Sequence, residues 1–143
     1  MNKVATLATA LVVLTAGCGG NGRTGGSGKG GGGAAPKPPA SCLDVSGQSM
    51  VEIVSAHNDY TPECMLVSPD QRIRVDNTDL VRHSFTVSQD DIYHTPFLVD
   101  IDEIEGGKKA TTDAVGGFLQ ANDPNPFFCK YHAGMEGELW LVS

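Results

Sequence analysis

The order of apolar and polar positions after residue 41 predicts a chain of short β-strands. Apolar and β-branched residues recur in brief runs between clusters of Asn, Asp, Pro and Gly, and no long stretch keeps a helical period. The predicted strands are 50–54, 65–67, 72–75, 84–87, 97–101, 110–115, 127–130 and 138–142. Many short strands separated by turns favour an all-β fold, an antiparallel Greek-key β-sandwich, over a helical or βαβ fold.

The stretch 41–143 has the length of one compact domain and shows no internal repeat. Two packed sheets need an apolar face on each strand to fill the space between them. The residues expected in this interior are Ile53, Ile73, Val75, Phe85, Val87, Phe97, Ile101, Phe118, Phe128, Leu139 and Leu141.

Residues 1–17 have the pattern of a lipoprotein signal peptide. Lys3 supplies a positive charge, and the apolar run that follows is too short to span a bilayer. The sequence Leu-Thr-Ala-Gly-Cys at 14–18 resembles the bacterial lipobox, although Thr15 is less usual there than an aliphatic residue. We therefore expect Cys18 to carry lipid and to anchor the exported protein to the outer face of a bacterial membrane. An ordinary cleaved signal with an incidental cysteine is the alternative reading.

Residues 18–40 form a predicted tether between this anchor and the domain. The segment is rich in Gly, contains Pro36, Pro38 and Pro39, and has almost no side chains large enough to pack. Such a composition cannot offset its ordering entropy by burial, so the segment is expected to be disordered.

A group of potential metal ligands lies near the C-terminus. Cys129, His132 and Met135 place a thiolate, an imidazole and a thioether donor within seven residues. Sulfur and imidazole ligands select copper, and a His₂Cys set with a weak axial Met is typical of blue-copper centres. The second imidazole must come from elsewhere, and His83 is the candidate because it stands where a polar turn enters a predicted strand.

These motifs together resemble the cupredoxins. Arg-His-Ser-Phe-Thr at 82–86, followed by Cys-x-x-His-x-x-Met at 129–135, is similar to the small plastocyanin- and amicyanin-like members. The resemblance implies one type 1 copper ion held by His83, Cys129, His132 and Met135, with electrons entering and leaving through the edge of His132. In the family an Asn commonly follows the first His and ties the ligand loops together. Here Ser84 takes that place, and its shorter hydroxyl is expected to replace the tie weakly or not at all.

The remaining two cysteines are expected to form a disulfide. With Cys18 assigned to lipid and Cys129 to metal, Cys42 and Cys64 are left, and an exported compartment is oxidising. Azurin-like cupredoxins also carry a bridge between their first strands. The expected role is structural, with a contribution of about 3 kcal/mol in the chain-entropy model. A redox switch is the alternative.

Charge narrows the possible partners. The chain has 17 acidic and 10 basic residues, and 41–143 holds all of the acidic but only six of the basic ones, a net charge of −11. Such a domain repels phosphate, which excludes nucleic acid. The acidic run 100–105, with Asp90 and Asp91, is expected to steer a basic redox partner such as a cytochrome or a membrane oxidoreductase. Solvated loops that only keep the domain soluble are the competing explanation.

These features together predict a monomeric, membrane-anchored electron carrier that is not an enzyme. Copper oxidases and nitrite reductases need further copper centres, and the two unassigned histidines, His57 and His94, are too few to supply them. A second metal site at His94 with nearby carboxylates is a minor alternative. A surface protein that sequesters or delivers copper would use the same ligands, whereas the complete donor set argues against a pure adhesion module.

Overall fold

The structure, a computed structural model, describes residues 35–89 and 97–142. The predicted signal peptide, Cys18, most of the predicted tether and His94 lie outside these residues. In the two described stretches, no helix is long and apolar enough to cross a membrane.

Short strands make up nearly all of the regular structure in the described chain. They are β1 (Leu43–Asp44), β2 (Met50–Ala56), β3 (Asp59–Thr61), β4 (Cys64–Val67), β5 (Arg72–Asn77), β6 (His83–Val87), β7 (Val99–Ile104), β8 (Lys109–Ala114), β9 (Pro124–Phe128) and β10 (Glu136–Leu141), with a 3₁₀ turn η1 (Val115–Gly117). Each strand predicted from the sequence is present with shifted bounds. β1 and β3 were not predicted, because neither contains an apolar run.

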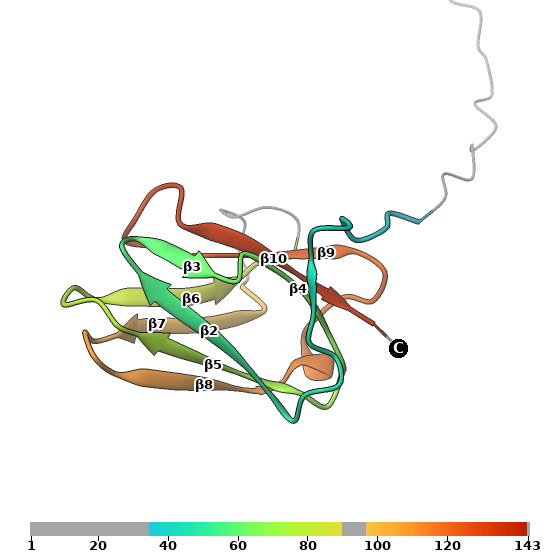
Figure 1. The fold of residues 1–143 in the computed structure, drawn as a ribbon, viewed down its shortest axis with the longest axis horizontal. Helices are drawn as coiled ribbons and strands as arrows, with labels where there is room; N and C mark the ends of the chain where they lie inside the picture. Colours follow the sequence, from blue (N-terminus) through green and yellow to red (C-terminus); the bar gives the residue numbers. More distant parts are fainter. Residues whose placement is uncertain (1–34, 90–96, 143) are drawn as a thin grey trace, which may run out of the picture. The chain divides into compact units, whose positions relative to one another are not determined.

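The strands form two sheets packed face to face (Figure 1). The larger sheet has the order β1-β4-β10-β9-β6-β7 and the smaller one β3-β2-β5-β8. The predicted β-sandwich is confirmed, and its sheets are mixed, since β1–β4, β4–β10 and β2–β5 pair in parallel. Between the two strands of each parallel pair, the chain passes through the opposite sheet. It then enters the second strand at the same end of the sandwich as the first, so the two strands run in the same direction.

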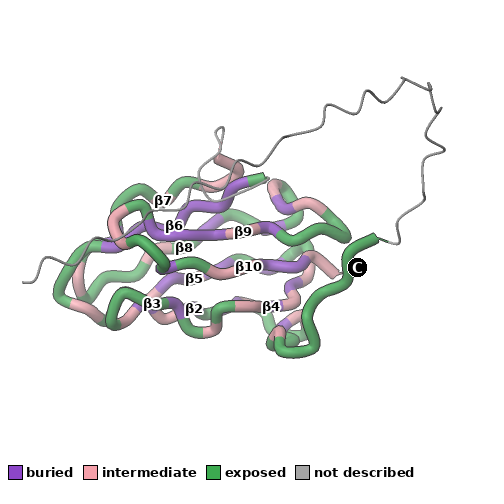
Figure 2. Tube along the Cα trace, turned by 90° about the horizontal axis from the view of Figure 1, so that it is seen from above, coloured by how far each residue is buried: buried purple, intermediate pink, exposed green. Residues whose placement is uncertain are grey.

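The space between the sheets is filled by alternate residues of the strands. On β2 the inward residues are Val51 and Ile53, and on β5 they are Ile73 and Val75, all at most 1% exposed. Figure 2 shows this buried strip running through the strands of both sheets. Because side chains alternate between the faces of a strand, the polar neighbours of these residues turn to solvent.

Aromatic packing corrects part of the predicted core. Both phenylalanines are buried, but Phe127 and not Phe128 belongs to the central cluster, with its ring 5.1 Å from that of Phe85. Phe128 belongs to the opposite face of β9, where its ring lies 5.7 Å from that of Phe97. Adjacent residues of a strand point to opposite faces, so a shift of one residue places the wrong phenylalanine on the inner face. Phe97, also expected inside, is half-buried on this opposite face, and the predicted core residues Ile101, Phe118 and Leu141 are half-buried at the margin of the core.

The turn between β2 and β3 explains why β3 was not predicted from the sequence. Its two turn residues, His57 and Asn58, both have positive φ, 57° and 60°. Such two-residue turns match the twist of antiparallel strands, but they usually carry Asn-Gly or Asp-Gly. The His-Asn pair gives a weak turn signal, and β3 itself contributes only Tyr60 to the interior.

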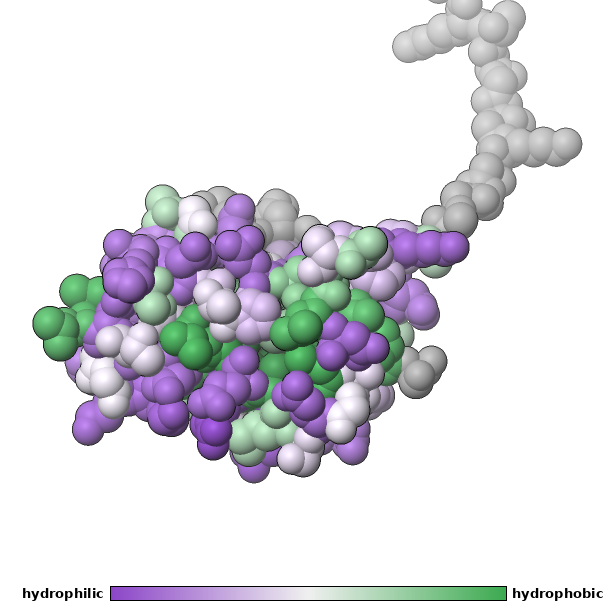
Figure 3. Space-filling model, in the orientation of Figure 1, coloured by the Kyte–Doolittle hydropathy of each residue, from purple (hydrophilic) through white to green (hydrophobic). Residues whose placement is uncertain are grey.

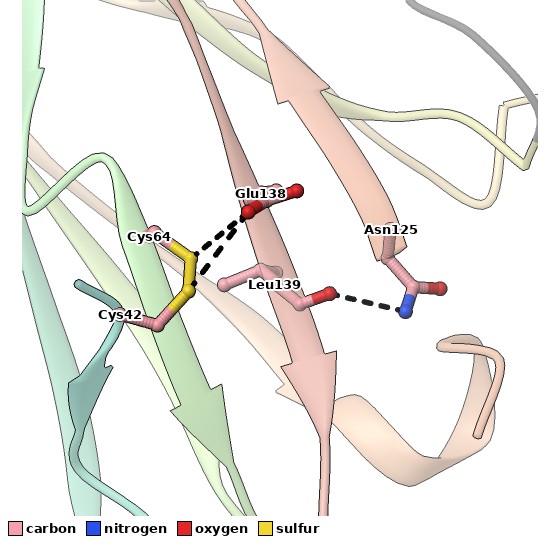
Figure 4. Close-up of a disulfide and its surroundings, with 5 residues drawn as sticks. All are labelled: Cys42, Cys64, Asn125, Glu138 and Leu139. Carbon is pink, nitrogen blue, oxygen red and sulfur yellow. Dashed lines mark hydrogen bonds between the residues drawn. A yellow bond between two sulfur atoms is a disulfide. The ribbon is translucent and has the colours of Figure 1, made fainter. Parts of the chain in front are cut away.

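The predicted disulfide between Cys42 and Cys64 is present (Figure 4). It joins the segment before β1 to the first residue of β4, across one edge of the larger sheet. A carboxylate oxygen of Glu138, on the neighbouring strand β10, lies 3.2 Å from Sγ of Cys64 and 3.8 Å from Sγ of Cys42. The bridge therefore faces an acidic side chain.

Candidate metal centre

Three of the predicted ligands are brought together because their strands are neighbours. His83 is the first residue of β6, and Cys129 directly follows the last residue of β9. β6 and β9 pair antiparallel, with Thr86 opposite Phe128, so the start of one strand lies beside the end of the other. His132 and Met135 belong to the loop that leads from β9 to β10. We refer to this end of the sandwich as the metal end.

The thiol and the two imidazoles form a compact cluster. Sγ of Cys129 lies 3.8 Å from Nδ1 of His83 and 3.4 Å from Nδ1 of His132. Donor atoms of the three residues all lie within 4.8 Å of one another, and the two imidazole rings are 4.7 Å apart. Cys129 is the one free cysteine among the described residues, and it is 5% exposed.

Met135 completes the loop around this cluster. Its N–H donates to the carbonyl of His132 (3.3 Å), and its carbonyl accepts from the N–H of Cys129 (2.9 Å). Gly134, with φ of +80°, makes this tight return possible. The Met135 side chain is 1% exposed and lines the same surface cavity, of about 430 Å³, as Cys129 and His132. Three of the four predicted ligands thus line one surface cavity, and the fourth, His83, contacts Cys129 from β6.

Asp79 orients His83 and was not identified from the sequence. Its Oδ2 accepts a hydrogen bond from Nε2 of His83 at 2.8 Å, which leaves Nδ1 free to face Cys129. The same carboxylate accepts from the N–H of Asn58 at 3.4 Å. Hydrogen bonds from the His57 backbone and then from His83 lower the pKa of Asp79, so the acceptor stays ionised. An acidic residue four positions before a metal-binding histidine was the available signal.

The loop that carries Asp79 is held in place by Asn77. The Asn77 side chain is fully buried, and its amide donates to the carbonyls of Val81 (2.8 Å) and Ile104 (2.7 Å). Its Oδ1 accepts from the N–H of Asp79 (3.0 Å). The orientation of His83 therefore rests on a chain of mostly partly buried hydrogen bonds that begins at a fully buried side chain.

Ser84 does tie the two ligand segments together. Its hydroxyl accepts a hydrogen bond from the N–H of Lys130 at 2.8 Å, and its own N–H donates to Sγ of Cys129 at 3.4 Å. The expectation of a weak or missing tie is therefore not met. The backbones of β6 and of the loop after β9 approach closely enough for a side chain as short as serine to reach.

The two histidines differ in exposure. His83 is wholly buried, whereas His132 is half-buried and is followed by the exposed residues Ala133 and Gly134. Loss of solvation, followed by the neighbouring His83 ring, lowers the pKa of His132. The His132 imidazole is therefore neutral over a wider pH range, as a metal ligand must be.

Basic residues next to the ligands contact the acidic strand β7. Arg82 pairs with Glu103 at 3.2 Å, and its guanidinium lies 4.5 Å from the centre of the Tyr131 ring. Lys130 pairs with both Asp100 and Asp102, at 2.7 and 2.6 Å. Part of the predicted acidic steering surface is thus neutralised within the protein.

The donor set fits a copper ion. A thiol, two imidazoles and a thioether at one end are the softer ligands that copper prefers, and among the described residues no carboxylate belongs to the cluster itself. The other described group of possible ligand residues, Cys42, Cys64 and Glu138, has its sulfurs joined in the disulfide. His57 lies in the exposed β2–β3 turn.

Comparison with solved structures identifies the fold. The chain aligns with reduced auracyanin from Roseiflexus castenholzii at a TM-score of 0.54 and 17% identity, covering 66% of this chain and 98% of auracyanin. It aligns with a reduced mutant form of amicyanin at 0.53 and 12% identity, covering 66% and 84%. The fold is cupredoxin-like. No protein-family model matches the sequence, and no curated protein sequence does so either.

A larger protein shares this fold over part of its length. The copper-containing nitrite reductase of Thermus scotoductus aligns at a TM-score of 0.51 and 15% identity, covering 65% of this chain. The chain spans only 22% of that protein. The cupredoxin-like fold therefore occurs both in small proteins of about this size and as one part of an enzyme.

Proposed function

We propose that the protein is a type 1, or blue-copper, electron-transfer protein that binds one copper ion. The observation that carries this proposal is the cluster of one thiol and two imidazoles, within 4.8 Å of one another, at the end of a cupredoxin-like sandwich. His83, Cys129 and His132 would be the strong ligands and Met135 the weak axial one. Bound copper would supply one-electron chemistry between its cuprous and cupric states.

The surroundings of the cluster favour electron transfer because they resist movement. Asp79 fixes the ring of His83, and Ser84 links the backbone on both sides of the site. Ligands held in this way keep nearly the same geometry in both oxidation states, and a small rearrangement makes electron transfer fast.

His132 provides the expected route for electrons. Because His83 is wholly buried, only the His132 imidazole reaches the surface, beside Ala133 and Gly134. The loop between β5 and β6 adds Leu80 and Val81, which are 101% and 50% exposed. Figure 3 shows a small apolar spot at the left edge, where Figure 1 places this loop, with hydrophilic surface next to it. A partner that docks here would approach the His132 edge.

A basic redox protein such as a cytochrome or a membrane oxidoreductase is the partner we propose. Asp102, Glu103 and Glu105 remain exposed beside the metal end, although Lys130 and Arg82 offset part of their charge. Complementary charge raises the association rate more than the final affinity. We further propose that the protein is exported, lipidated at Cys18 and held at a membrane outer face, where the tether allows the domain to reorient.

The deciding experiment is a titration of the purified metal-free protein with Cu(II), followed by visible spectroscopy. One equivalent should produce an intense copper–thiolate band at roughly 600 nm. Met135→Leu should keep the colour and mainly shift the reduction potential. A protein that stays colourless and binds no copper tightly contradicts the proposal.

A copper-sequestering or delivery protein would have the same ligands and must be separated by kinetics. An electron carrier should retain copper in both oxidation states and exchange electrons rapidly with a small redox protein. Transfer of Cu(I) to an added chelator within the time of a single electron exchange would instead favour delivery.

A further inference from the structure

All three polar groups of Ser84 are engaged, and the third contact comes from the opposite sheet. The Ser84 N–H donates to Sγ of Cys129 (3.4 Å), and its hydroxyl accepts from the N–H of Lys130 (2.8 Å). Its carbonyl accepts a hydrogen bond from the hydroxyl of Tyr60. Tyr60 belongs to β3, the edge strand of the smaller sheet, whereas Ser84 belongs to β6 of the larger one. The contact therefore crosses the sandwich.

Tyr60 needs a hydrogen-bond partner in the core as well as space for its ring. The side chain is 1% exposed, and its ring packs edge-on against Phe85 at 6.2 Å and Phe127 at 5.1 Å. A phenylalanine would fill the same space without bringing a polar atom into the interior. A buried hydroxyl is tolerated only when it is hydrogen-bonded, and the Ser84 carbonyl supplies that partner.

The Tyr60 hydroxyl is the donor in this hydrogen bond, because a carbonyl oxygen can only accept. The bond is buried, where a hydrogen bond is stronger than in water. This carbonyl and the N–H that faces Cys129 lie on either side of the same Cα, so holding the carbonyl restricts the backbone rotation that would turn the N–H away from the sulfur.

We propose that Tyr60 is a positioning residue for Cys129: reaching from the opposite sheet, it holds Ser84 so that the Ser84 N–H donates to the cysteine sulfur. The part of this inference that concerns copper rests on the proposed function. Hydrogen bonds to the cysteine sulfur withdraw electron density from it and tune the reduction potential of such centres. Without the Tyr60 hydroxyl, the sulfur is more electron-rich and favours the oxidised metal.

The test variant is Tyr60→Phe, which keeps the ring and removes the hydroxyl. In the metal-free protein, the Ser84 amide should exchange with solvent about 5-fold faster, the effect of losing roughly 1 kcal/mol of hydrogen bonding. In the copper-loaded protein, the copper–thiolate band should shift and the reduction potential should fall. Unchanged Ser84 exchange together with an unchanged potential would overturn the proposal.

Ser68→Ala is the matched control. The Ser68 hydroxyl donates to the carbonyl of Ser46 at 2.7 Å, beyond the last residue of β4 and away from the metal end. This variant loses the same kind of bond, so it should lose similar stability without moving the copper–thiolate band or the potential. If both variants move the potential equally, the effect reflects general loosening and the proposal is wrong.

A measurement on the unaltered protein guards against a variant that fails to fold. In the metal-free wild type, the hydroxyl proton of Tyr60 should be protected from exchange and should show a nuclear Overhauser contact to Ser84. An unprotected hydroxyl proton would contradict the proposal. Because this measurement and the Ser84 exchange need no copper, they remain decisive if the copper proposal itself fails.

Discussion

The chain uses cysteine in two opposite ways. Cys129 is buried and unpaired, and it lies among hydrogen-bond donors and imidazoles: the Ser84 N–H at 3.4 Å and Nδ1 of His132 at 3.4 Å. Cys42 and Cys64 are half-buried and joined to each other, and they face the carboxylate of Glu138, whose oxygen is 3.2 Å from Cys64. Donors surround one sulfur, and an anion lies beside the others.

This difference in neighbours explains the difference in chemistry. A nearby N–H or cation favours the thiolate, which is the form that binds metal, whereas a nearby carboxylate disfavours it. At Cys129 the sulfur is unpaired and faces the Ser84 N–H and the His132 ring, and a bound metal ion would itself favour the thiolate that binds it. At Cys42 and Cys64 a thiolate would be repelled by Glu138, so the bridged form is favoured over the reduced one.

Replacing each kind of cysteine in turn is the most direct test of this difference between the cysteines. Cys129→Ser should abolish the copper–thiolate band completely, because serine cannot supply the thiolate. The double variant Cys42→Ser/Cys64→Ser should keep the band in position and intensity. Visible spectra of both variants at equal copper loading decide the point. A coloured Cys129→Ser protein would mean that the sulfur ligand has been assigned to the wrong cysteine.

Removal of the disulfide should lower the unfolding free energy of the protein and leave the copper–thiolate band unchanged. The disulfide spans 22 positions, and the chain-entropy model gives a bridge of this span about 3 kcal/mol. Urea unfolding of the metal-free Cys42→Ser/Cys64→Ser variant should show a loss of this size.

A dithiol reductant provides the control for the bridge. It should destabilise the wild type to the level of the double variant and leave the double variant unchanged. If the reductant destabilises both proteins equally, the effect does not come from the bridge.

Sequence reasoning identified the residues whose chemistry is distinctive and missed those that act through contacts. The spacing of Cys129, His132 and Met135 is legible because one short loop carries all three. Asp79 and Tyr60 were missed: the spacing of Asp79 from His83 is a weak signal because acidic turn residues are common, and an isolated aromatic residue such as Tyr60 gives no signal. Asp79 acquires its role when the loop between β5 and β6 folds next to His83, and Tyr60 acquires its role when β3 packs against β6.

The same limit applied to the fold. Short strands between turn residues predicted a sandwich, but parallel pairs such as β2–β5 depend on the path of the chain between the sheets. Which of Phe127 and Phe128 faces the other sheet depends on where pairing with β6 and β10 begins. Neither is a local property of the sequence.

Removing the tie between the two segments that carry the predicted ligands should have a moderate effect. Ser84→Ala removes the hydroxyl that accepts from the N–H of Lys130 at 2.8 Å. A partly buried N–H left without a partner should lower the unfolding free energy by about 1 to 2 kcal/mol. Urea unfolding of the metal-free variant measures this loss, and Ser68→Ala serves again as the control for a lost hydroxyl elsewhere. A Ser84→Ala protein as stable as the wild type would show that the tie between the two segments is not energetically important.

The smallest predicted effect is that of the Glu138 carboxylate on the rate at which the disulfide is reduced. Disulfides are reduced by attack of a thiolate, and Glu138 repels an attacking thiolate that carries a further negative charge. At about 4 Å in water this repulsion is about 1 kcal/mol, or roughly a 5-fold change in rate. Glu138→Gln should therefore speed reduction by an anionic thiol such as mercaptoethanesulfonate more than reduction by the cationic thiol cysteamine. Asp113→Asn, which removes an equal charge from a fully exposed position on β8, should change neither rate. Equal acceleration by both thiols would mean that Glu138 shields the sulfurs by its bulk rather than by its charge.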